Sequence, residues 1–133
     1  MSGIKDAKEM LVVAEHDFKA LKGMTDSEIF VDEVFGFHAQ QAVEKSLKAW
    51  ISALGSNYPF IHDLSALINI LERLGCDVSD LWDFVELNVF AVQFRYNTFL
   101  SPEEPLDRLE IIERVQKVFD KVKGITEKEG VEL

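Results

Sequence analysis

Hydrophobic residues recur at steps of three and four along most of the chain, a spacing that places them on one face of an α-helix. This pattern predicts a first helix that ends at Gly23 and a second that runs from about Asp32 to Leu54. A third helix is expected between Asp63 and Gly75, because Asp favours the position before a helix and Gly the position after it. The first apolar stripe consists of Ile4, Ala7, Leu11, Ala14, Phe18 and Leu21.

Two further helices are expected in the second half of the chain. Asp77 or Ser79 is predicted to open the fourth. From Leu81 to Tyr96 apolar residues point in nearly every direction, which is typical of a helix covered on all sides by its own bundle or by a second subunit. Ser101-Pro102-Glu103-Glu104 has the pattern of a capping box, and the final helix is therefore expected to begin there.

The predicted fold class is all-α, because no segment shows the period-two alternation of a half-buried strand. The expected architecture is an up-and-down bundle of four long helices and a shorter one, formed by residues 1–124. Gly124 is expected to end the last helix, so that residues 125–133 form a polar C-terminal tail. A length of 133 residues suits one domain of this kind.

Charge and hydropathy limit where the protein works and what it binds. The net charge of −10, from 14 basic and 24 acidic residues, disfavours a general affinity for a phosphate backbone, so any contact with nucleic acid must be local. No apolar run approaches the roughly 18 residues of a membrane helix. The charged segment Met1–Met10 does not resemble an export signal, and a cytoplasmic location is expected.

The sequence offers no pattern for a metal or a cofactor. No Glu has a His three residues later, as a carboxylate-bridged di-metal site in a helical bundle would need. The three His lie on different segments, and the single Cys76 has no second Cys with which to bind zinc. The seven Gly are scattered and form no phosphate-binding loop. We therefore expect no metal, no cofactor and no confident catalytic residue.

A polar strip follows one side of the second predicted helix. At about 100° per residue, four polar side chains share this side with Phe37, and His38 lies at its border. The strip consists of Gln41, Glu44, Lys45 and Lys48. It can be a solvated face carrying an i,i+4 pair between Glu44 and Lys48, or it can be a binding surface.

Asn88 and Arg95 lie seven residues apart, and hence on one stripe of the fourth predicted helix, among apolar neighbours. A covered guanidinium needs an anion, which can be Glu86, a carboxylate of another helix or a phosphate-bearing ligand. His62 precedes the expected Asp63 cap and places a titratable group beside the loop.

Three segments resemble the HEPN domain family and occur in that family's order and approximate spacing. They are Phe37-His38-Ala39-Gln40-Gln41-Ala42-Val43-Glu44-Lys45-Ser46-Leu47-Lys48-Ala49, His62-Asp63-Leu64 and Phe94-Arg95-Tyr96. The resemblance covers nearly the whole chain. It implies a helical bundle that is usually a dimer and is often encoded beside a minimal nucleotidyltransferase as a toxin–antitoxin pair. Many members of the family are ribonucleases.

The ribonuclease members of the family carry an Arg followed, after four to six residues, by a His. In this chain no Arg is followed by a His at any spacing, and the residues after Arg95-Tyr96 include none that titrates near neutral pH. The resemblance therefore favours a subunit that binds a nucleotide or RNA without cleaving it. Its expected binding residues are Arg95, Tyr96, Gln41, Glu44, Lys45, Lys48 and Asn88.

Two other hypotheses remain open at this point. In the first, the protein is a metal-independent ribonuclease in which His62 or His38 replaces the missing His of the motif. In the second, it is a structural adaptor dimer without a ligand, and a carboxylate inside the dimer neutralises Arg95. The expected partners are a second copy of the chain, a minimal nucleotidyltransferase and a nucleotide or RNA, but no membrane.

Overall fold

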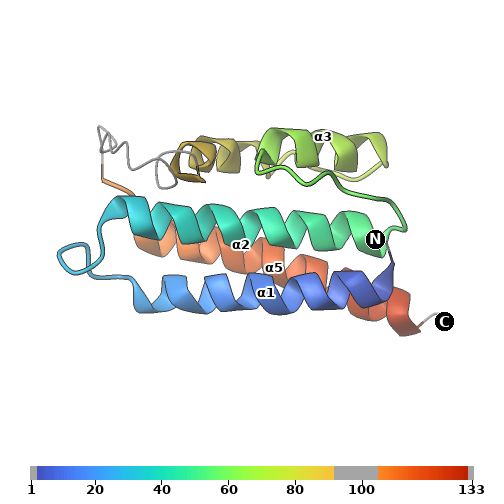
Figure 1. The fold of residues 1–133 in the computed structure, drawn as a ribbon, viewed down its shortest axis with the longest axis horizontal. Helices are drawn as coiled ribbons and strands as arrows, with labels where there is room; N and C mark the ends of the chain where they lie inside the picture. Colours follow the sequence, from blue (N-terminus) through green and yellow to red (C-terminus); the bar gives the residue numbers. More distant parts are fainter. Residues whose placement is uncertain (1–2, 92–104, 132–133) are drawn as a thin grey trace.

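The computed structural model describes residues 3–91 and 105–131, and these two ranges contain helices and no β-strand (Figure 1). The prediction of an all-α fold is therefore confirmed. None of the described helices has both the length and the apolar character needed to cross a membrane. The elements are α1 (Ile4–Gly23), α2 (Asp32–Ala53), α3 (Leu64–Arg73), the 3₁₀ helix η1 (Trp82–Leu87) and α5 (Arg108–Val131), and residues 88–91 are also helical.

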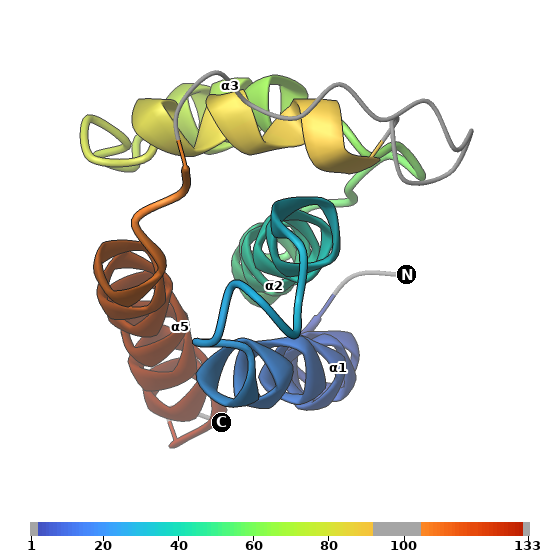
Figure 2. The same ribbon diagram turned by 90° about the vertical axis from the view of Figure 1, so that its left-hand side faces the viewer.

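The three longest helices form one bundle, on which the shorter helices lie as a second layer. α1 and α2 run antiparallel, and α5 runs alongside both (Figure 1). Figure 2 shows α2 between α1 on one side and α3 with the segment after it on the other. Because α2 contacts α1, α3, η1 and α5, 17 of its 22 residues are buried. This central position explains why α2 can hold polar side chains away from water.

The helix boundaries follow the local rules that predict them. Asp63 caps α3 by accepting a hydrogen bond from the backbone N–H of Ser65 at 2.9 Å. Gly55 and Gly75 follow the ends of α2 and α3 with φ angles of 84° and 88°. This left-handed conformation is strained for other residues, so both glycines are suited to ending a helix.

The expected α-helical start at Asp77 or Ser79 is wrong. Asp77 instead accepts hydrogen bonds from the backbone N–H and the hydroxyl of Ser79, which closes a turn. Residues 82–87 then form a 3₁₀ helix. Its buried residues Phe84 and Leu87, and the buried Leu81 directly before it, recur every three positions, which matches the three residues per turn of a 3₁₀ helix.

The final helix begins and ends later than predicted. The proposed capping box at residues 101–104 lies outside the described residues, but residues 105–107 are not helical and α5 begins at Arg108. Asp107 caps it by accepting a hydrogen bond from the backbone N–H of Glu110 at 3.2 Å. The helix also continues through Gly124 to Val131, where an end at Gly124 was expected. Thr126, which is 1% exposed, extends the buried face past the glycine.

Arg108 joins the start of α5 to the connection between α1 and α2. Its guanidinium donates hydrogen bonds to the backbone carbonyls of Met24 and Phe30 and to the Asp32 carboxylate. It also lies 4.9 Å from the centre of the Phe35 ring. With 6% exposure, this side chain fixes the first turn of α2 against α5.

Candidate functional site

A connected group of polar side chains lies between the middle of α2 and the loop that precedes α3. At its centre is Glu44, whose side chain is 2% exposed. Nδ1 of His62 lies 3.0 Å from Oε1 of Glu44, and Nζ of Lys48 lies 3.1 Å from Oε2. One buried carboxylate thus holds two groups that are able to carry positive charge.

Two glutamines of α2 extend this group. Gln40, which is fully buried, donates its amide N–H groups to Glu44 Oε1 and to the backbone carbonyl of His62, at 3.1 and 3.2 Å. Gln41 donates to the Gln40 side-chain carbonyl at 2.7 Å. These bonds tie the His62 backbone, as well as its ring, to α2.

The i,i+4 pair between Glu44 and Lys48 is present, but the interpretation of the strip as a solvated face is wrong for three of its four polar residues. Gln41 is 8% exposed, Glu44 2% and Lys48 6%. The physical reason is the second layer, because α3 and η1 both contact α2. The loop also covers Lys48, whose Nζ lies 5.6 Å from the centre of the Tyr58 ring.

A second group of the same composition lies between α1 and α2. His38 Nδ1 is 2.9 Å from Asp17 Oδ1, and Lys45 Nζ is 2.7 Å from Asp17 Oδ2. The side chains are 29% exposed for His38, 22% for Lys45 and 12% for Asp17. As in the first group, one carboxylate binds one imidazole and one ammonium.

The pKa of Asp17 lies below its ordinary value of 3.8. Burial raises this pKa, but the hydrogen bonds from His38 and Lys45, together with their charges, lower it by more. Asp17 is therefore a carboxylate throughout the physiological range, and it orients both of its partners.

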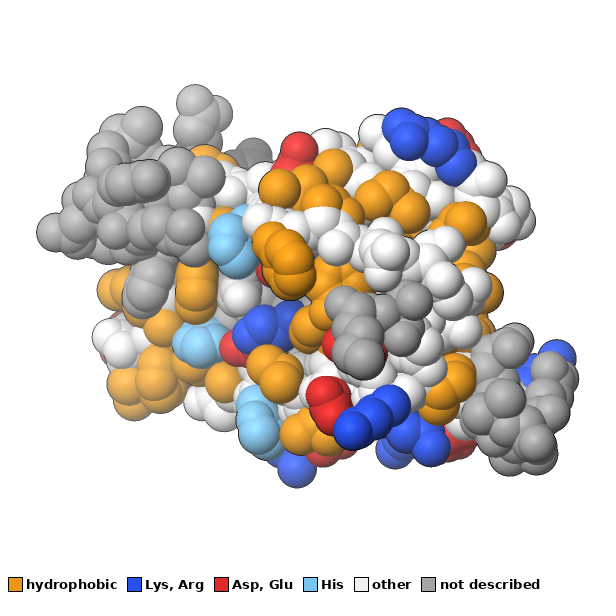
Figure 3. All heavy atoms as spheres, turned by 45° about the vertical axis from the view of Figure 1, so that its right-hand side comes forward, with side chains coloured by type: hydrophobic (Ala, Val, Ile, Leu, Met, Phe, Trp, Pro, Cys, Tyr) orange, Lys and Arg blue, Asp and Glu red, His pale blue; other side chains and the backbone are white. Residues whose placement is uncertain are grey.

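Both imidazoles turn one nitrogen toward a carboxylate. Within residues 3–91 and 105–131, the Nε2 atoms of His38 and His62 have no hydrogen-bond partner. When the proton is on Nδ1, Nε2 is a free acceptor, and in the imidazolium form it is a free donor. Figure 3 shows histidine side chains on one face of the molecule, with lysine, acidic and hydrophobic side chains between them. This face can donate, accept and transfer protons.

Asn88 joins the segment after η1 to the start of α3. Its carbonyl oxygen accepts from the backbone N–H of Leu64, and its amide N–H donates to Asp63 Oδ1, each at 3.0 Å. The pKa of Asp63 lies below its ordinary value of 3.8. Hydrogen bonds from Ser65, which are the largest influence, and from Asn88 lower this pKa by more than burial raises it. Asn88 therefore holds the residues next to His62, and its expected contact with phosphate stays a prediction.

The structure brings together six of the residues singled out from the sequence, in two groups around Glu44 and Asp17. Arg95 and Tyr96 lie outside the described residues, and their roles stay predictions. The sequence alone did not single out Gln40, Asp17 or Tyr58. Asp17 lies three residues after Ala14 and four before Leu21, both on the apolar stripe of α1, and an acidic residue on such a stripe is a signal of a buried partner.

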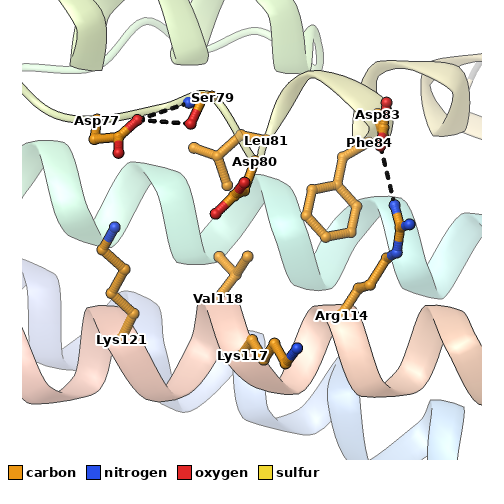
Figure 4. A pocket seen from close by; sticks show the side chains of 10 residues that line it. All are labelled: Asp77, Ser79, Asp80, Leu81, Asp83, Phe84, Arg114, Lys117, Val118 and Lys121. Carbon is orange, nitrogen blue, oxygen red and sulfur yellow. Dashed lines mark hydrogen bonds and ion pairs between the residues drawn. The ribbon is translucent and has the colours of Figure 1, made fainter.

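A groove of about 390 Å³ lies elsewhere on the molecule, between the start of η1 and α5 (Figure 4). Acidic side chains line one wall, among them Asp77, Asp80 and Asp83, and basic side chains of α5 line the other. Arg114 bridges them by donating to Asp83 at 3.1 Å. This exposed ion pair attaches η1 to α5, so the groove has a role in packing the fold.

Among the described residues, no group of three or more His, Cys, Asp and Glu side chains is arranged to hold a metal ion. The side chains of the two polar groups can form hydrogen bonds and charge pairs, and an imidazole can transfer a proton.

Comparison with known proteins identifies a family but no individual relative. A family model described as the HEPN domain matches residues 7–125, which is most of the chain. The match contains both polar groups as well as Arg95 and Tyr96. No curated protein and no solved structure matches the chain. The protein belongs to the HEPN domain family.

Proposed function

We propose that this chain is a nucleotide- or RNA-binding HEPN subunit that acts as a homodimer beside a minimal nucleotidyltransferase, in a toxin–antitoxin-like pair. Membership of the family supports a nucleotide- or RNA-related role. The observation that carries the proposal is the geometry of His62, which is 45% exposed and hydrogen-bonded to a carboxylate that is 2% exposed. A buried acid that orients an exposed imidazole is an arrangement suited to a ligand.

Exposure divides the polar residues into two roles. The more exposed His62, His38 and Lys45 would contact the ligand, together with Arg95 and Tyr96. The buried Gln40, Gln41, Glu44 and Lys48 would hold the contacting groups in place. Lys48 already has Glu44 as its counter-ion, so its contribution to phosphate binding would be indirect.

The overall charge limits the binding mode. A net charge of −10 repels a polyanion, so the ligand would be a nucleotide or a short single-stranded segment of RNA that meets only the polar face of α2. Each phosphate that a basic side chain neutralises adds about one to the slope of log affinity against log salt. We expect a shallow slope here, because few basic groups are available.

Exposed apolar residues in η1 and directly after it support the homodimer. Trp82 is 39% exposed and Val89 45%, although both belong to the apolar segment that was expected to be covered on all sides. Their neighbours Phe84 and Phe90 are buried within the chain. A second subunit would cover the face that the chain's own bundle leaves open.

The test is isothermal titration of the protein with ATP, GTP and a short single-stranded RNA, with light scattering to measure the oligomeric state. Arg95→Ala and His62→Ala should weaken binding, and His16→Ala, which removes an exposed histidine of α1, is the matched control. Binding that weakens with salt in the wild type and is reduced in both variants supports the proposal. A folded dimer that binds none of these ligands contradicts it and favours the adaptor hypothesis.

The two imidazole–carboxylate pairs favour ribonuclease activity as a second candidate function. Metal-independent cleavage of RNA needs a base that removes the proton of the 2′-hydroxyl and an acid that protonates the leaving 5′-oxygen. His62 with Glu44 and His38 with Asp17 each combine an imidazole with a carboxylate that orients it. This arrangement supplies groups for the reaction that do not depend on the missing His after Arg95.

Cleavage is tested with single-stranded RNA in the presence of EDTA. Activity that is lost in His62→Gln or His38→Gln, and is retained in His16→Gln, would establish the candidate. Products ending in a 2′,3′-cyclic phosphate would identify attack by the 2′-hydroxyl. An inactive wild type that still binds RNA would reject cleavage and leave the binding proposal intact.

A further inference from the structure

An exposed aromatic side chain lies two residues before His62. Phe60 is 89% exposed, the highest exposure among the large exposed hydrophobic side chains of the described residues. It belongs to the loop between α2 and α3, the same loop that brings His62 to Glu44. Single exposed apolar residues are common on protein surfaces, so the position of Phe60 matters more than its exposure.

Contacts connect Phe60 to the buried polar group. Lys48, which is bonded to Glu44, lies under the Tyr58 ring, and the Tyr58 ring meets the Phe60 ring edge to face at 6.2 Å. Burial and the nearby carboxylate of Asp6 in α1 raise the pKa of the Tyr58 hydroxyl, and Pro59 restricts the backbone between the two aromatic residues. The Phe60 ring is thus positioned by its neighbours while its surface stays in water.

We propose that Phe60 is a stacking platform for a base of single-stranded RNA, supported by Tyr58 and placed beside the phosphate- or ribose-contacting His62. This inference rests on the proposed RNA-binding function and names the part of the ligand that the loop recognises. Stacking suits this acidic protein, because attraction between a base and an aromatic ring does not require a positive surface.

Stacking on Phe60 would also favour single-stranded RNA over duplex RNA. The bases of a duplex are stacked on one another, so an aromatic side chain can reach a base face only where a strand is unpaired. Phe60 would stack without preference for a particular base, since each base has a π-face. Specificity for particular bases would have to come from hydrogen bonds elsewhere in the site.

The experiment compares the affinity of the full chain for a short single-stranded RNA, for the same RNA in a duplex and for an abasic strand of the same length. Phe60→Ala should weaken binding of the single strand about tenfold. Phe60→Trp should retain binding, because it keeps an aromatic surface. Leu109→Ala removes a side chain of 72% exposure from α5 and should leave the affinity unchanged.

The control ligands separate stacking from other causes. Binding of the abasic strand should be the same for the wild type and Phe60→Ala, because that strand offers no base to stack. If the wild type binds RNA and Phe60→Ala binds it equally well, the stacking role is overturned and the proposed function stands. If Phe60→Ala changes the oligomeric state and not RNA binding, Phe60 belongs to a protein interface and the inference is also overturned. A wild type that binds no RNA overturns the inference, and the proposed function then depends on the titrations with ATP and GTP.

Discussion

Nδ1 of His62 lies 3.0 Å from Oε1 of Glu44, so a side chain of the loop before α3 is joined to a carboxylate in the middle of α2. The imidazole is 45% exposed and the carboxylate 2%. This contact helps the Gln40 side chain to hold the loop on the bundle, and it determines which ring nitrogen faces outward. Under the proposed function, the stability of the fold and the binding of a ligand would be linked at this position.

Replacing Glu44 should lower the free energy of unfolding, because Lys48 would lose its counter-ion. Glu44→Gln keeps the shape of the side chain but leaves the ammonium of Lys48 without its counter-ion, although the Lys48 side chain is only 8% exposed. We expect a loss of about 3 kcal/mol in the free energy of unfolding, measured with urea. Glu44→Gln combined with Lys48→Met should lose less than Glu44→Gln alone, because no unpaired charge remains. The explanation would be contradicted if the double variant lost as much unfolding free energy as Glu44→Gln and Lys48→Met lose separately when their losses are added.

Gly36 allows the segment after η1 to approach α2. A Cβ atom at this position would clash with the ring of Phe90, which is 3% exposed. Gly36→Ala should therefore lower the free energy of unfolding by about 1–3 kcal/mol, as overpacking does. Gly124→Ala is the control, because no atom lies within 4 Å of the added Cβ; it should raise the stability of α5 by about 0.5–1 kcal/mol. Equal effects of both substitutions would show that Phe90 does not pack as described.

Arg108 and Arg114 form a matched pair on α5. Arg108 is 6% exposed and donates to two carbonyls and a carboxylate, whereas Arg114 is 47% exposed and pairs with Asp83 and Glu110 at the surface. Arg108→Lys should cost about 2–3 kcal/mol in denaturant unfolding, since an ammonium cannot reproduce the fork of a guanidinium. Arg114→Lys should have no measurable effect. A stable Arg108→Lys variant would contradict the role of this residue as the link between α2 and α5.

The lowered pKa of Asp17 predicts a dependence of stability on pH. Because the folded state lowers this pKa below 3.8, Asp17 contributes its full stabilisation well above that value, and the contribution is lost as the pH falls through the lowered pKa. The difference in unfolding free energy between wild type and Asp17→Asn should be constant above about pH 5 and should shrink toward pH 3. Asp80→Asn, at an exposed position in the groove beside α5, controls for the removal of one negative charge. A difference that grows on acidification would contradict the assignment.

Local rules predicted the parts of the fold that depend on neighbours in sequence. Asp63, Gly55 and Gly75 mark helix ends because caps and left-handed glycines act within a few residues. The Glu44–Lys48 pair was likewise predictable from its spacing of four. The 3₁₀ form of residues 82–87 was missed, because period three and period 3.6 differ little over two turns.

The parts of the site that the sequence did not predict depend on long-range packing. Gln40 and Glu44 are buried because the loop that contains Tyr58 and His62 folds back over α2. No local sequence pattern predicts this packing of the loop on the helix. Asp17 meets His38 across 21 positions of sequence. Only the position of Asp17 on the apolar stripe of α1 indicated that this carboxylate has a buried partner.

The central claim is that His62, oriented by Glu44, contacts RNA. The most direct test is the titration of a fluorescently labelled single-stranded RNA with wild type, His62→Gln and His16→Gln at neutral pH, read by anisotropy. We predict that His62→Gln binds about tenfold more weakly, as expected for the loss of a hydrogen bond to a charged group, and that His16→Gln binds like the wild type. Equal affinities of all three proteins would contradict the claim.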